Sequence, residues 1–465
     1  MGQPIILTVI LLKTVLGQCI ITMYNNSSEI QAEEQEEWVL GRSSIDFDSN
    51  NPELQKGFDW ARAQAEAFIH DDAEVGPCYE AALPGRDAFC MRDMSHQSGG
   101  AHCLGLTEHN SNMMGAFARN ISEAKDWCSW WEITFEGKPA PVDYSSDADF
   151  WYNLPANFDI MDTASRLYDL TGDAWYLLSP EMENFFRLTV EKYIPRWDRD
   201  GDGIVDRADS DGRRGIASYE ENGTTGYSAA ADALALEYRA YLAAARMALL
   251  KKEPEKASEY LERADRLREI FCREWWTEQE ARFYEFRMKD GSFSPKQSDD
   301  NAMTPLRCGI IRDPAQIAGQ IRYLLSTEPE TIVELRSYYP AMLWKYGWDA
   351  EAMRIWLKMT AEDYKRRDYP EVSYAAVEAL FCGYMGISAD AEKSEVWTRS
   401  AAADGEWSEV TGFPLWGGFI DLRHEGKRKS TLTNRTERTL SWTAETEGGT
   451  ARRQVHAGET IMICD

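Results

Sequence analysis

The sequence is poor in positive charge and in histidine. Its 50 Lys and Arg residues are outnumbered by 78 Asp and Glu residues, which gives a formal net charge of −28 at pH 7, and it has only 6 His. A surface of this sign repels nucleic acid and anionic membranes, so neither is an expected partner. No Lys/Arg-rich stretch offers the basic patch that a long polyanionic substrate would need.

Long apolar runs and paired cysteines are also missing. The apolar run at residues 5–12 is too short to span a bilayer, and no positive charge precedes it as in a signal peptide. The run could be a poor signal sequence, or a strand or helix packed on the domain, and the sequence does not decide between them. The nine cysteines contain no CxxC pair. They read mostly as small buried hydrophobes, which favours a reducing, cytoplasmic location, although secretion stays open. The sequence does not indicate an oligomeric state.

Strand patterns are absent between the helical segments. Residues 76–100 read as a loop rich in Gly, Pro and Cys, whereas apolar residues recur at helical spacing elsewhere. A succession of helices with no strand pattern between them excludes a βαβ fold. Because there is no fixed repeat period, a closed ring of helix pairs is favoured over a solenoid. The helical segments are predicted near residues 51–69, 107–123, 156–171, 180–194, 227–251, 255–275, 313–326, 332–346, 349–366 and 372–385.

The predicted fold is therefore all-α, an (α/α)6 barrel or six-hairpin toroid, with a small C-terminal β tail. We expect an N-terminal extension at residues 1–50, the catalytic barrel at residues 51–403 and the β segment at residues 404–465. Within the tail, residues 429–433 and 439–444 alternate like strands, and residues 434–437 read as the hairpin turn between them.

Polar side chains of many types gather between residues 83 and 102. Adjacent Arg and Asp residues in a loop can hold vicinal hydroxyls, because the guanidinium donates in a fixed fork and the carboxylate accepts. An ion pair that braces the loop is the alternative. The candidate substrate-binding residues of this cluster are Arg86, Arg92, Asp93, His96, Gln97 and His102.

A second cluster combines carboxylates and amides with aromatic rings, as sugar subsites do. Flat aromatic faces suit the apolar faces of sugars, although aromatic side chains also fill helical cores. The same Asp and Asn residues could instead cap a helix. The candidates here are Trp131, Asp143, Asp149, Trp151, Tyr152 and Asn153.

The segment from Asp198 to Asp209 has the spacing of a calcium-binding loop. Carboxylates stand at positions 1, 3, 5, 9 and 12, and Gly203 stands at position 6. A turn that caps helices without metal is the alternative. Asp198, Asp200, Asp202 and Asp206 are the candidate ligands of a structural Ca²⁺, and the chemistry itself requires no cofactor.

Two adjacent carboxylic acids, Glu220 and Glu221, stand in a loop after this segment. Cleavage of a glycosidic bond needs a proton donor and a second carboxylate that activates water or attacks carbon. Neighbouring charges raise one pKa, which suits the donor. For the second carboxylate, Glu371 is preferred by a small margin over Glu334; both stand where a loop enters a helix beside Tyr and Ser, although Glu371 could simply be a first-turn acid.

In this order, the motifs resemble those of the six-hairpin glycosidases, the group that includes glucoamylase-like enzymes. Arg92-Asp93 is similar to the pair that holds the sugar at the cleavage subsite, and Tyr219-Glu220-Glu221 to the segment whose first Glu is the general acid. Residues 198–206 are similar to a segment of bile-acid glucosidase-like enzymes. The span from residue 78 to about residue 424 looks like a branch with β-glucuronidase relatives. The resemblance implies that Glu220 is the proton donor, but no segment clearly matches the base.

The sequence thus predicts a glycoside hydrolase that removes a terminal sugar, with Glu220 as acid and Glu371 as base or nucleophile. A β-linked uronic acid and a neutral sugar both fit, since Arg86 or Arg92 could pair with a carboxylate. A sugar epimerase or uronate lyase on the same barrel is a second hypothesis, with His96, His102 and Tyr338 as acid and base. A non-catalytic carbohydrate-binding protein is the third.

Overall fold

The computed structural model describes residues 45–220, 225–295 and 299–465. The apolar run at residues 5–12 and Glu221 lie outside the described residues, and so does nearly all of the expected N-terminal extension. The described residues form one compact unit, within which the predicted barrel and β segment are in contact.

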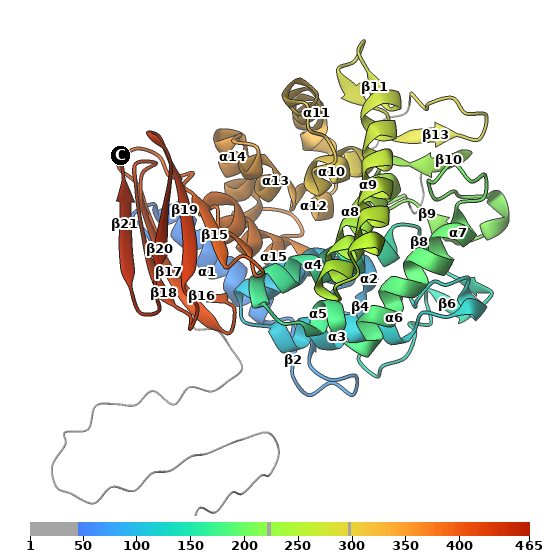
Figure 1. Cartoon of the computed structure of the whole chain (residues 1–465), viewed down its shortest axis with the longest axis horizontal. Helices are drawn as coiled ribbons and strands as arrows, with labels where there is room; N and C mark the ends of the chain where they lie inside the picture. The colour runs from blue at the N-terminus through green and yellow to red at the C-terminus, as the bar shows by residue number, and fades with distance from the viewer. Residues whose placement is uncertain (1–44, 221–224, 296–298) are drawn as a thin grey trace, which may run out of the picture. The chain divides into compact units, whose positions relative to one another are not determined.

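Helices in two layers make up the larger part of this unit (Figure 1). Among the described residues, six inner helices contact one another in sequence, and the last returns to the first, so the ring is closed. The inner helices are α2 (Met91–Cys103), α4 (Ala156–Thr171), α8 (Ala231–Leu250), α10 (Asp299–Cys308), α13 (Tyr339–Lys345) and α15 (Pro370–Glu378).

The outer helices pack against this ring and match the predicted segments. They are α1 (Pro52–Glu66), α3 (Thr107–Arg119), α6 (Pro180–Leu188), α9 (Pro254–Glu274), α11 (Pro314–Thr327) and α14 (Asp349–Thr360). The short helices α5 (Trp175–Leu178), α7 (Ile194–Trp197) and α12 (Val333–Arg336) complete the connections, with π-helical turns at Thr189–Tyr193 and Ala379–Tyr384.

Helix α1 shows why the outer layer was readable from the sequence. The side chain of Asn51 accepts hydrogen bonds from the backbone N–H groups of Glu53 and Leu54, and Pro52 occupies the first helical position. Leu54, Phe58, Ala61 and Ala65 are buried on one face. The resulting amphipathic period is the signal that the sequence carries.

Helix α2 corrects the loop predicted over residues 76–100. All of its thirteen residues are buried, so it has no polar face and no amphipathic period. Its glycines allow close packing, since a Cβ on Gly100 would lie 2.1 Å from the carbonyl oxygen of Tyr374 in α15. The arginine and aspartate of the first cluster are therefore held on a buried inner helix.

The β region is larger than the small tail predicted. A five-stranded sheet has the order β1-β16-β17-β18-β21, and a four-stranded sheet has the order β14-β15-β19-β20. Strand β1 comes from before the barrel, and β14 begins at Ser388. The strands are β1 (Asp46–Ser49), β14 (Ser388–Asp390), β15 (Glu395–Arg399), β16 (Trp407–Leu415), β17 (Gly418–Glu425), β18 (Lys429–Arg435), β19 (Leu440–Thr446), β20 (Gly449–Val455) and β21 (Thr460–Cys464).

The predicted hairpin at residues 434–437 is wrong. Strand β18 pairs with β17 and β21, whereas β19 pairs with β15 and β20, so the connection passes from one sheet to the other. Buried Asn434 organises this crossing, because its amide donates to the carbonyl oxygens of Arg438 and Val455.

Short two-stranded sheets also lie between the helices, where no strand was expected. Each is too short to give an alternating pattern. They are formed by β2 (Ile69–His70), β3 (Cys78–Tyr79), β4 (Ala88–Cys90), β5 (Glu132–Thr134), β6 (Tyr144–Ser146), β7 (Asp149–Phe150), β8 (Tyr152–Asn153), β9 (Arg214–Ile216), β10 (Tyr227–Ala230), β11 (Trp276–Thr277), β12 (Arg282–Phe283) and β13 (Phe286–Met288).

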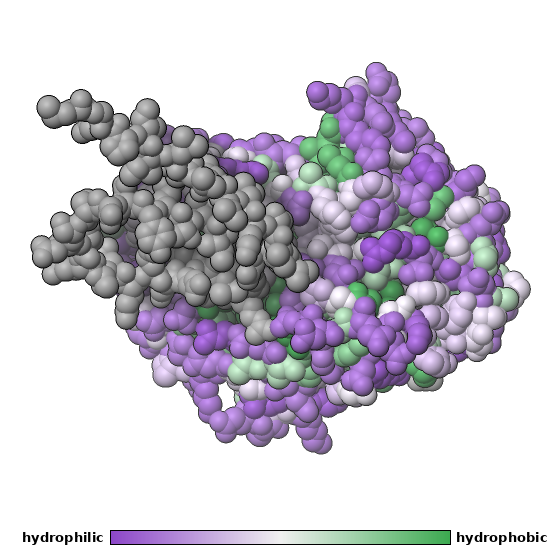
Figure 2. Space-filling view, turned by 90° about the horizontal axis from the view of Figure 1, so that it is seen from below, coloured by the Kyte–Doolittle hydropathy of each residue, from purple (hydrophilic) through white to green (hydrophobic). Residues whose placement is uncertain are grey.

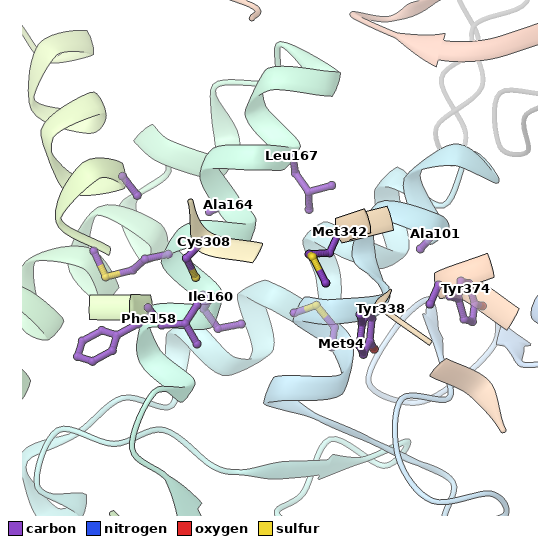
Figure 3. Close-up of a cluster of buried hydrophobic side chains, with 14 of the residues drawn as sticks. Met94, Ala101, Phe158, Ile160, Ala164, Leu167, Cys308, Tyr338, Met342 and Tyr374 are labelled. Carbon is purple, nitrogen blue, oxygen red and sulfur yellow. The ribbon is translucent and has the colours of Figure 1, made fainter. Parts of the chain in front are cut away.

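The core runs between the inner helices. Figure 3 shows Met94 of α2 beside Tyr338, with Met342 of α13 close by and Phe158 and Ile160 on α4. The face visible in Figure 2 is mostly hydrophilic, with apolar residues in small separate groups. None of the described helices combines the length and the apolar character needed to cross a membrane.

Candidate active site

The candidate site lies where α2 and α15 begin and where the loops around residues 153, 219 and 338 converge. The N-terminal turn of α2 carries Arg92 and Asp93, and that of α15 carries Glu371. These residues come from distant parts of the chain, and the ring of inner helices brings them together.

Glu371 is the most deeply buried of the candidate catalytic carboxylates, at 1% exposure. Its Oε1 accepts a hydrogen bond from the hydroxyl of Tyr338 at 2.6 Å and a longer one from that of Tyr219 at 3.4 Å, while Oε2 has no hydrogen-bond partner among the described residues. Burial, followed by the charge of Asp93, raises the pKa of Glu371 well above its usual range. A simple first-turn acid would instead be stabilised in its charged form by the helix dipole.

Arg92 supplies a positive charge close to Glu371. Its Nε donates to Oδ1 of Asp93 at 3.1 Å, and its Nη1 donates to Oδ1 of Asn153 at 3.2 Å. The guanidinium lies 3.8 Å from the ring centroid of Tyr219 and 5.4 Å from that of Trp131. Two aromatic faces and two oxygen partners hold it in one orientation, which suits a fixed hydrogen-bonding group.

Tyr219 and Glu220 occupy a tight turn, as expected for a loop residue pair. Tyr219 has a φ of +59°, an uncommon backbone conformation for a residue with a side chain. Glu220 is buried at 8% exposure, and its N–H donates to the carbonyl oxygen of Ala217 at 3.3 Å. The turn is anchored by Asp232 of α8, whose Oδ2 accepts from the N–H of Ser218 at 2.8 Å.

Asp232 is an acid that the sequence reading missed. It is fully buried, and burial is the main reason that its pKa rises to about 6; the nearby charge of Glu220 adds to the effect. Its place at the start of an Ala-rich helix gave it the appearance of an ordinary first-turn acid. It supplies a second carboxyl group beneath the Glu220 turn.

His96 lies below these groups in the interior of the ring. Its Nδ1 is 3.4 Å from the Tyr219 hydroxyl, and its Nε2 is 3.4 Å from Oδ1 of Asp159. Burial, together with the charges of Arg307 and Arg92, lowers the pKa of His96 well below its usual range, so the imidazole is neutral at pH 7.

Asp159 and Arg307 also escaped the sequence reading. Burial raises the pKa of Asp159 to about 7, and Nη2 of Arg307 lies 3.5 Å from its Oδ1. Asp159 falls six residues beyond Asn153, the last residue of the second cluster, and Arg307 stands on α10, which was not predicted as a helix. Polar residues that recur on the inward face of α4 could have identified Asp159 as a candidate. The sequence around Arg307 has no feature that distinguishes it.

Arg86 and Asp143 lie together in a cluster behind Trp131. Arg86 Nη1 donates to Oε2 of Glu132 at 2.7 Å and lies 3.7 Å from Oδ2 of Asp143. Burial, followed by the neighbouring Asp143 carboxyl, raises the pKa of Glu132 to about 8. The backbone joins this cluster to α2, because the N–H of Met91 donates to the carbonyl oxygen of Trp131.

Other predicted site residues have different surroundings. His102 Nε2 is 3.0 Å from the carbonyl oxygen of Pro414 in β16, so it contacts the β region. Tyr152 is a fully buried residue whose hydroxyl donates to Asn157 at 2.5 Å. Asp149 is exposed and pairs with Arg213. Trp151 is half-buried against the core, and the amide of Gln97 is buried with no hydrogen-bond partner among the described residues.

The predicted metal loop brings three of its four carboxylates together. One oxygen each from Asp198, Asp200 and Asp206 lie within 4.8 Å of one another. Asp206 Oδ1 is buried without a hydrogen-bond partner among the described residues but lies 3.7 Å from Nη2 of Arg287, and burial raises the pKa of Asp206 to about 6. Asp202 instead accepts from Nη1 of Arg287 at 2.7 Å, and Asp209 at position 12 pairs with Lys289. The three converging oxygens fit a hard cation.

Solved structures with the same fold are carbohydrate-active enzymes. A putative kojibiose phosphorylase from human microbiome matches 91% of this chain and 63% of its own at 10% identity (TM-score 0.62). An α-L-rhamnosidase from Dictyoglumus thermophilum matches 91% and 50% at 11% identity (TM-score 0.61). A GH78 family rhamnosidase of Bacillus sp. GL1 matches 84% and 40% at 15% identity (TM-score 0.57).

The chain has an (α/α)6-barrel fold. It spans less than two thirds of the length of each of these three proteins. No protein-family model matches it, and no curated protein sequence does. The fold expected from the sequence is thus confirmed for the barrel, with the larger β region as the difference.

Proposed function

We propose that the protein is a glycoside hydrolase that removes a terminal sugar from an oligo- or polysaccharide. The observation that carries this proposal is the hydrogen bond that links the Tyr219–Glu220 turn to Glu371. The Tyr219 hydroxyl donates to Glu371, and Glu220 is the next residue along the chain. Glycosidic cleavage requires two carboxyl groups at one site, and this link supports the choice of Glu220 and Glu371 for the two roles.

In the proposed reaction, Glu220 protonates the leaving oxygen, and Glu371 activates water or attacks the anomeric carbon. Arg92 and Asp93 hold hydroxyls of the sugar in the cleavage subsite, with Trp131 and Tyr219 fixing the guanidinium. The fold shared with rhamnosidases and a phosphorylase supports a carbohydrate substrate. A uronic acid and a neutral sugar at that subsite are both compatible with the sequence.

The proposal is tested by incubating the full chain with chromogenic glycosides, namely β-glucuronide, β-glucoside, β-galactoside, α-glucoside and α-rhamnoside. We expect release from at least one substrate, and a loss of at least about 100-fold in kcat for Glu220→Gln and for Glu371→Gln, because general acid catalysis alone contributes about that much. Glu362→Gln, which removes an exposed carboxylate paired with Lys56, is the matched control. Unchanged activity of Glu220→Gln would show that another group is the acid.

A sugar epimerase or uronate lyase is the second candidate, supported by one observation. His96 is neutral and contacts the rings of Tyr219 and Tyr338, and a general base must be neutral before it takes up a proton. The other predicted histidine, His102, contacts β16 instead. An epimerase or lyase predicts that His96→Ala abolishes turnover and that no reducing sugar is released from any glycoside. A purely binding protein predicts that Glu220→Gln and Glu371→Gln leave sugar affinity unchanged and that no turnover exists.

We further propose that residues 198–206 bind a structural Ca²⁺ through Asp198, Asp200 and Asp206. The loop immediately precedes the strand and turn that carry Tyr219 and Glu220. We expect a chelator to lower the thermal midpoint and added Ca²⁺ to restore it, because a ligand that binds only the folded state stabilises that state. Asp206→Asn should abolish the response, whereas the exposed Asp290→Asn should retain it. Identical midpoints with chelator and with Ca²⁺ would refute the site.

A further inference from the structure

We infer that the cleavage subsite takes an electrically neutral sugar rather than a uronic acid, an inference that rests on the proposed function. A uronate carries a carboxylate on the ring and needs a cation free to pair with it. Around this site, Arg86, Arg92, Arg307 and Arg366 each lie against a carboxylate of the protein. The sequence alone left both sugar types open.

The two arginines that could bind a uronate already have carboxylate partners. Arg92 bonds to Asp93 and is enclosed between Tyr219 and Trp131. Arg86 bonds to Glu132 at 2.7 Å. A substrate carboxylate would have to displace these partners or share the guanidinium with them, and either event leaves a buried carboxylate less well compensated.

The remaining basic groups near the site are held in the same way. Arg307 lies 3.5 Å from Asp159, and His96 is neutral. Lys365, Arg366 and Arg367 form a short basic run that the sequence reading passed over. Arg366 lies 3.0 Å from Oε1 of Glu334, a carboxylate close enough to Glu371 to affect its titration.

Arg367 contacts the outer helix α1. Its guanidinium lies 4.1 Å from a ring centroid of Trp60 in α1, and its Nη2 donates to the carbonyl oxygen of Thr360. Arg366 is therefore engaged with a carboxylate, and Arg367 with an aromatic ring and a carbonyl oxygen. The Lys365 side chain is exposed.

The other charged groups near the site are mostly acidic. Asp93 and Glu334 both act on Glu371, and Asp232 lies near Glu220. The pKa of Asp232 rises to about 6 and that of Asp159 to about 7, chiefly because both are buried. The burial that opposes ionisation of these acids also opposes the burial of an unpaired substrate carboxylate.

This electrostatic environment suits the reaction itself. Glycosidic cleavage passes through a transition state with oxocarbenium character, in which positive charge develops on the sugar ring. When it is ionised as base or nucleophile, the Glu371 carboxylate stabilises that charge and so binds the transition state better than the ground state. The same charge repels a carboxylate on the ring, so one group both favours cleavage and selects against uronates.

The experiment compares matched substrates that differ only at the C6 group. The 4-nitrophenyl β-glucoside and β-glucuronide form one pair, and the β-galactoside and β-galacturonide form a second. We expect the neutral member of the cleaved pair to have a kcat/KM about 100-fold higher, because like-charge contacts in a desolvated site cost several kcal/mol. A higher kcat/KM for the uronide would overturn the inference while supporting the proposed hydrolase.

Binding to the Glu220→Gln variant gives a second readout that does not need turnover. Calorimetry with glucose, glucuronic acid and the protonated iminosugar 1-deoxynojirimycin should give the order iminosugar, then glucose, then glucuronate. Tighter binding of glucuronate than of glucose overturns the inference even if no glycoside is cleaved. If none of the glycosides is cleaved and none of these ligands binds, the proposed function fails, and the inference fails with it.

Glu334→Gln changes the charge balance at one defined point. It removes a carboxylate near Glu371 and leaves the guanidinium of Arg366 without its acid partner. We expect the uronide-to-glycoside ratio of kcat/KM to rise about tenfold. Glu362→Gln, the surface control, should leave the ratio unchanged. An unchanged ratio in Glu334→Gln would contradict the electrostatic basis of the selection.

Discussion

At the scale of single residues, the protonation of Glu371 is the property on which the proposed chemistry depends most. A base or nucleophile must be ionised, yet burial and the acids around it favour the protonated form. The hydroxyl of Tyr338, 2.6 Å away, opposes this effect because it donates to the charged carboxylate. The balance between these influences should set the acidic limb of the pH–rate profile.

We predict that Tyr338→Phe shifts this limb to higher pH. Losing a hydrogen bond to a charged group costs about 1.5 kcal/mol or more, which corresponds to about one pH unit in the pKa of Glu371. Activity at pH 6 should therefore fall several-fold more than activity at pH 8, as a kcat/KM profile from pH 4 to 9 would record. Tyr384→Phe, which removes a hydroxyl bonded to Ser408, is the control. A parallel loss at every pH would instead point to a structural role for Tyr338.

Some candidate site residues stood out in the sequence because their local context was unusual. Arg92, Asp93 and Glu220 stand in polar clusters with aromatic neighbours, and the structure brings the first two close to Glu371. Asp159 was missed because it is one of several polar residues on α4, and Arg307 because α10 was not predicted as a helix. Only the closed ring makes them neighbours of His96, and ring closure is a long-range property that no local pattern encodes.

At the scale of elements, the inner and outer helices differ in how far their sequences reveal them. Outer helices such as α1 have one solvent-exposed face, so their apolar residues recur with a clear helical period. Helix α2 is buried on all sides, and its paired glycines read as loop residues. The glycines serve packing instead, because Gly99 and Gly100 lie against Glu378 and Tyr374 of α15.

We predict that Gly100→Ala is strongly destabilising. The added Cβ would lie 2.1 Å from a backbone carbonyl oxygen, which cannot move without shifting α15. The expected loss is about 3 kcal/mol in the free energy of unfolding, measured by urea titration. Activity should fall as well, because α2 and α15 carry Arg92 and Glu371.

Gly115→Ala in α3 is the matched control for this packing argument. Its Cβ would meet the flexible end of the Arg119 side chain, which can move aside. In a helix interior the change from Gly to Ala gains up to about 1 kcal/mol. Equal effects of the two substitutions would show that the contact between α2 and α15 is not as close as described.

At the scale of the whole molecule, buried acids and the overall negative charge act in the same direction. The pKa of Glu132 rises to about 8 and that of Glu285 to about 7, in each case mainly because the group is buried, and Glu237 and Glu371 are raised well above their usual range. Each of these groups holds a proton in the folded state at a pH where the unfolded chain has lost it. By linkage, the free energy of unfolding falls as pH rises through that interval.

We predict a thermal midpoint about 5 °C lower at pH 8.5 than at pH 6.5, since a few kcal/mol moves the midpoint of a large domain by several degrees. Scanning calorimetry at constant Ca²⁺ measures it, and Glu132→Gln should reduce the difference. High salt screens the repulsion within the net charge of −28 but leaves buried groups largely unaffected. A difference that vanishes in 0.5 M salt, roughly three times physiological ionic strength, would therefore assign the effect to the surface, whereas one that persists assigns it to the buried acids.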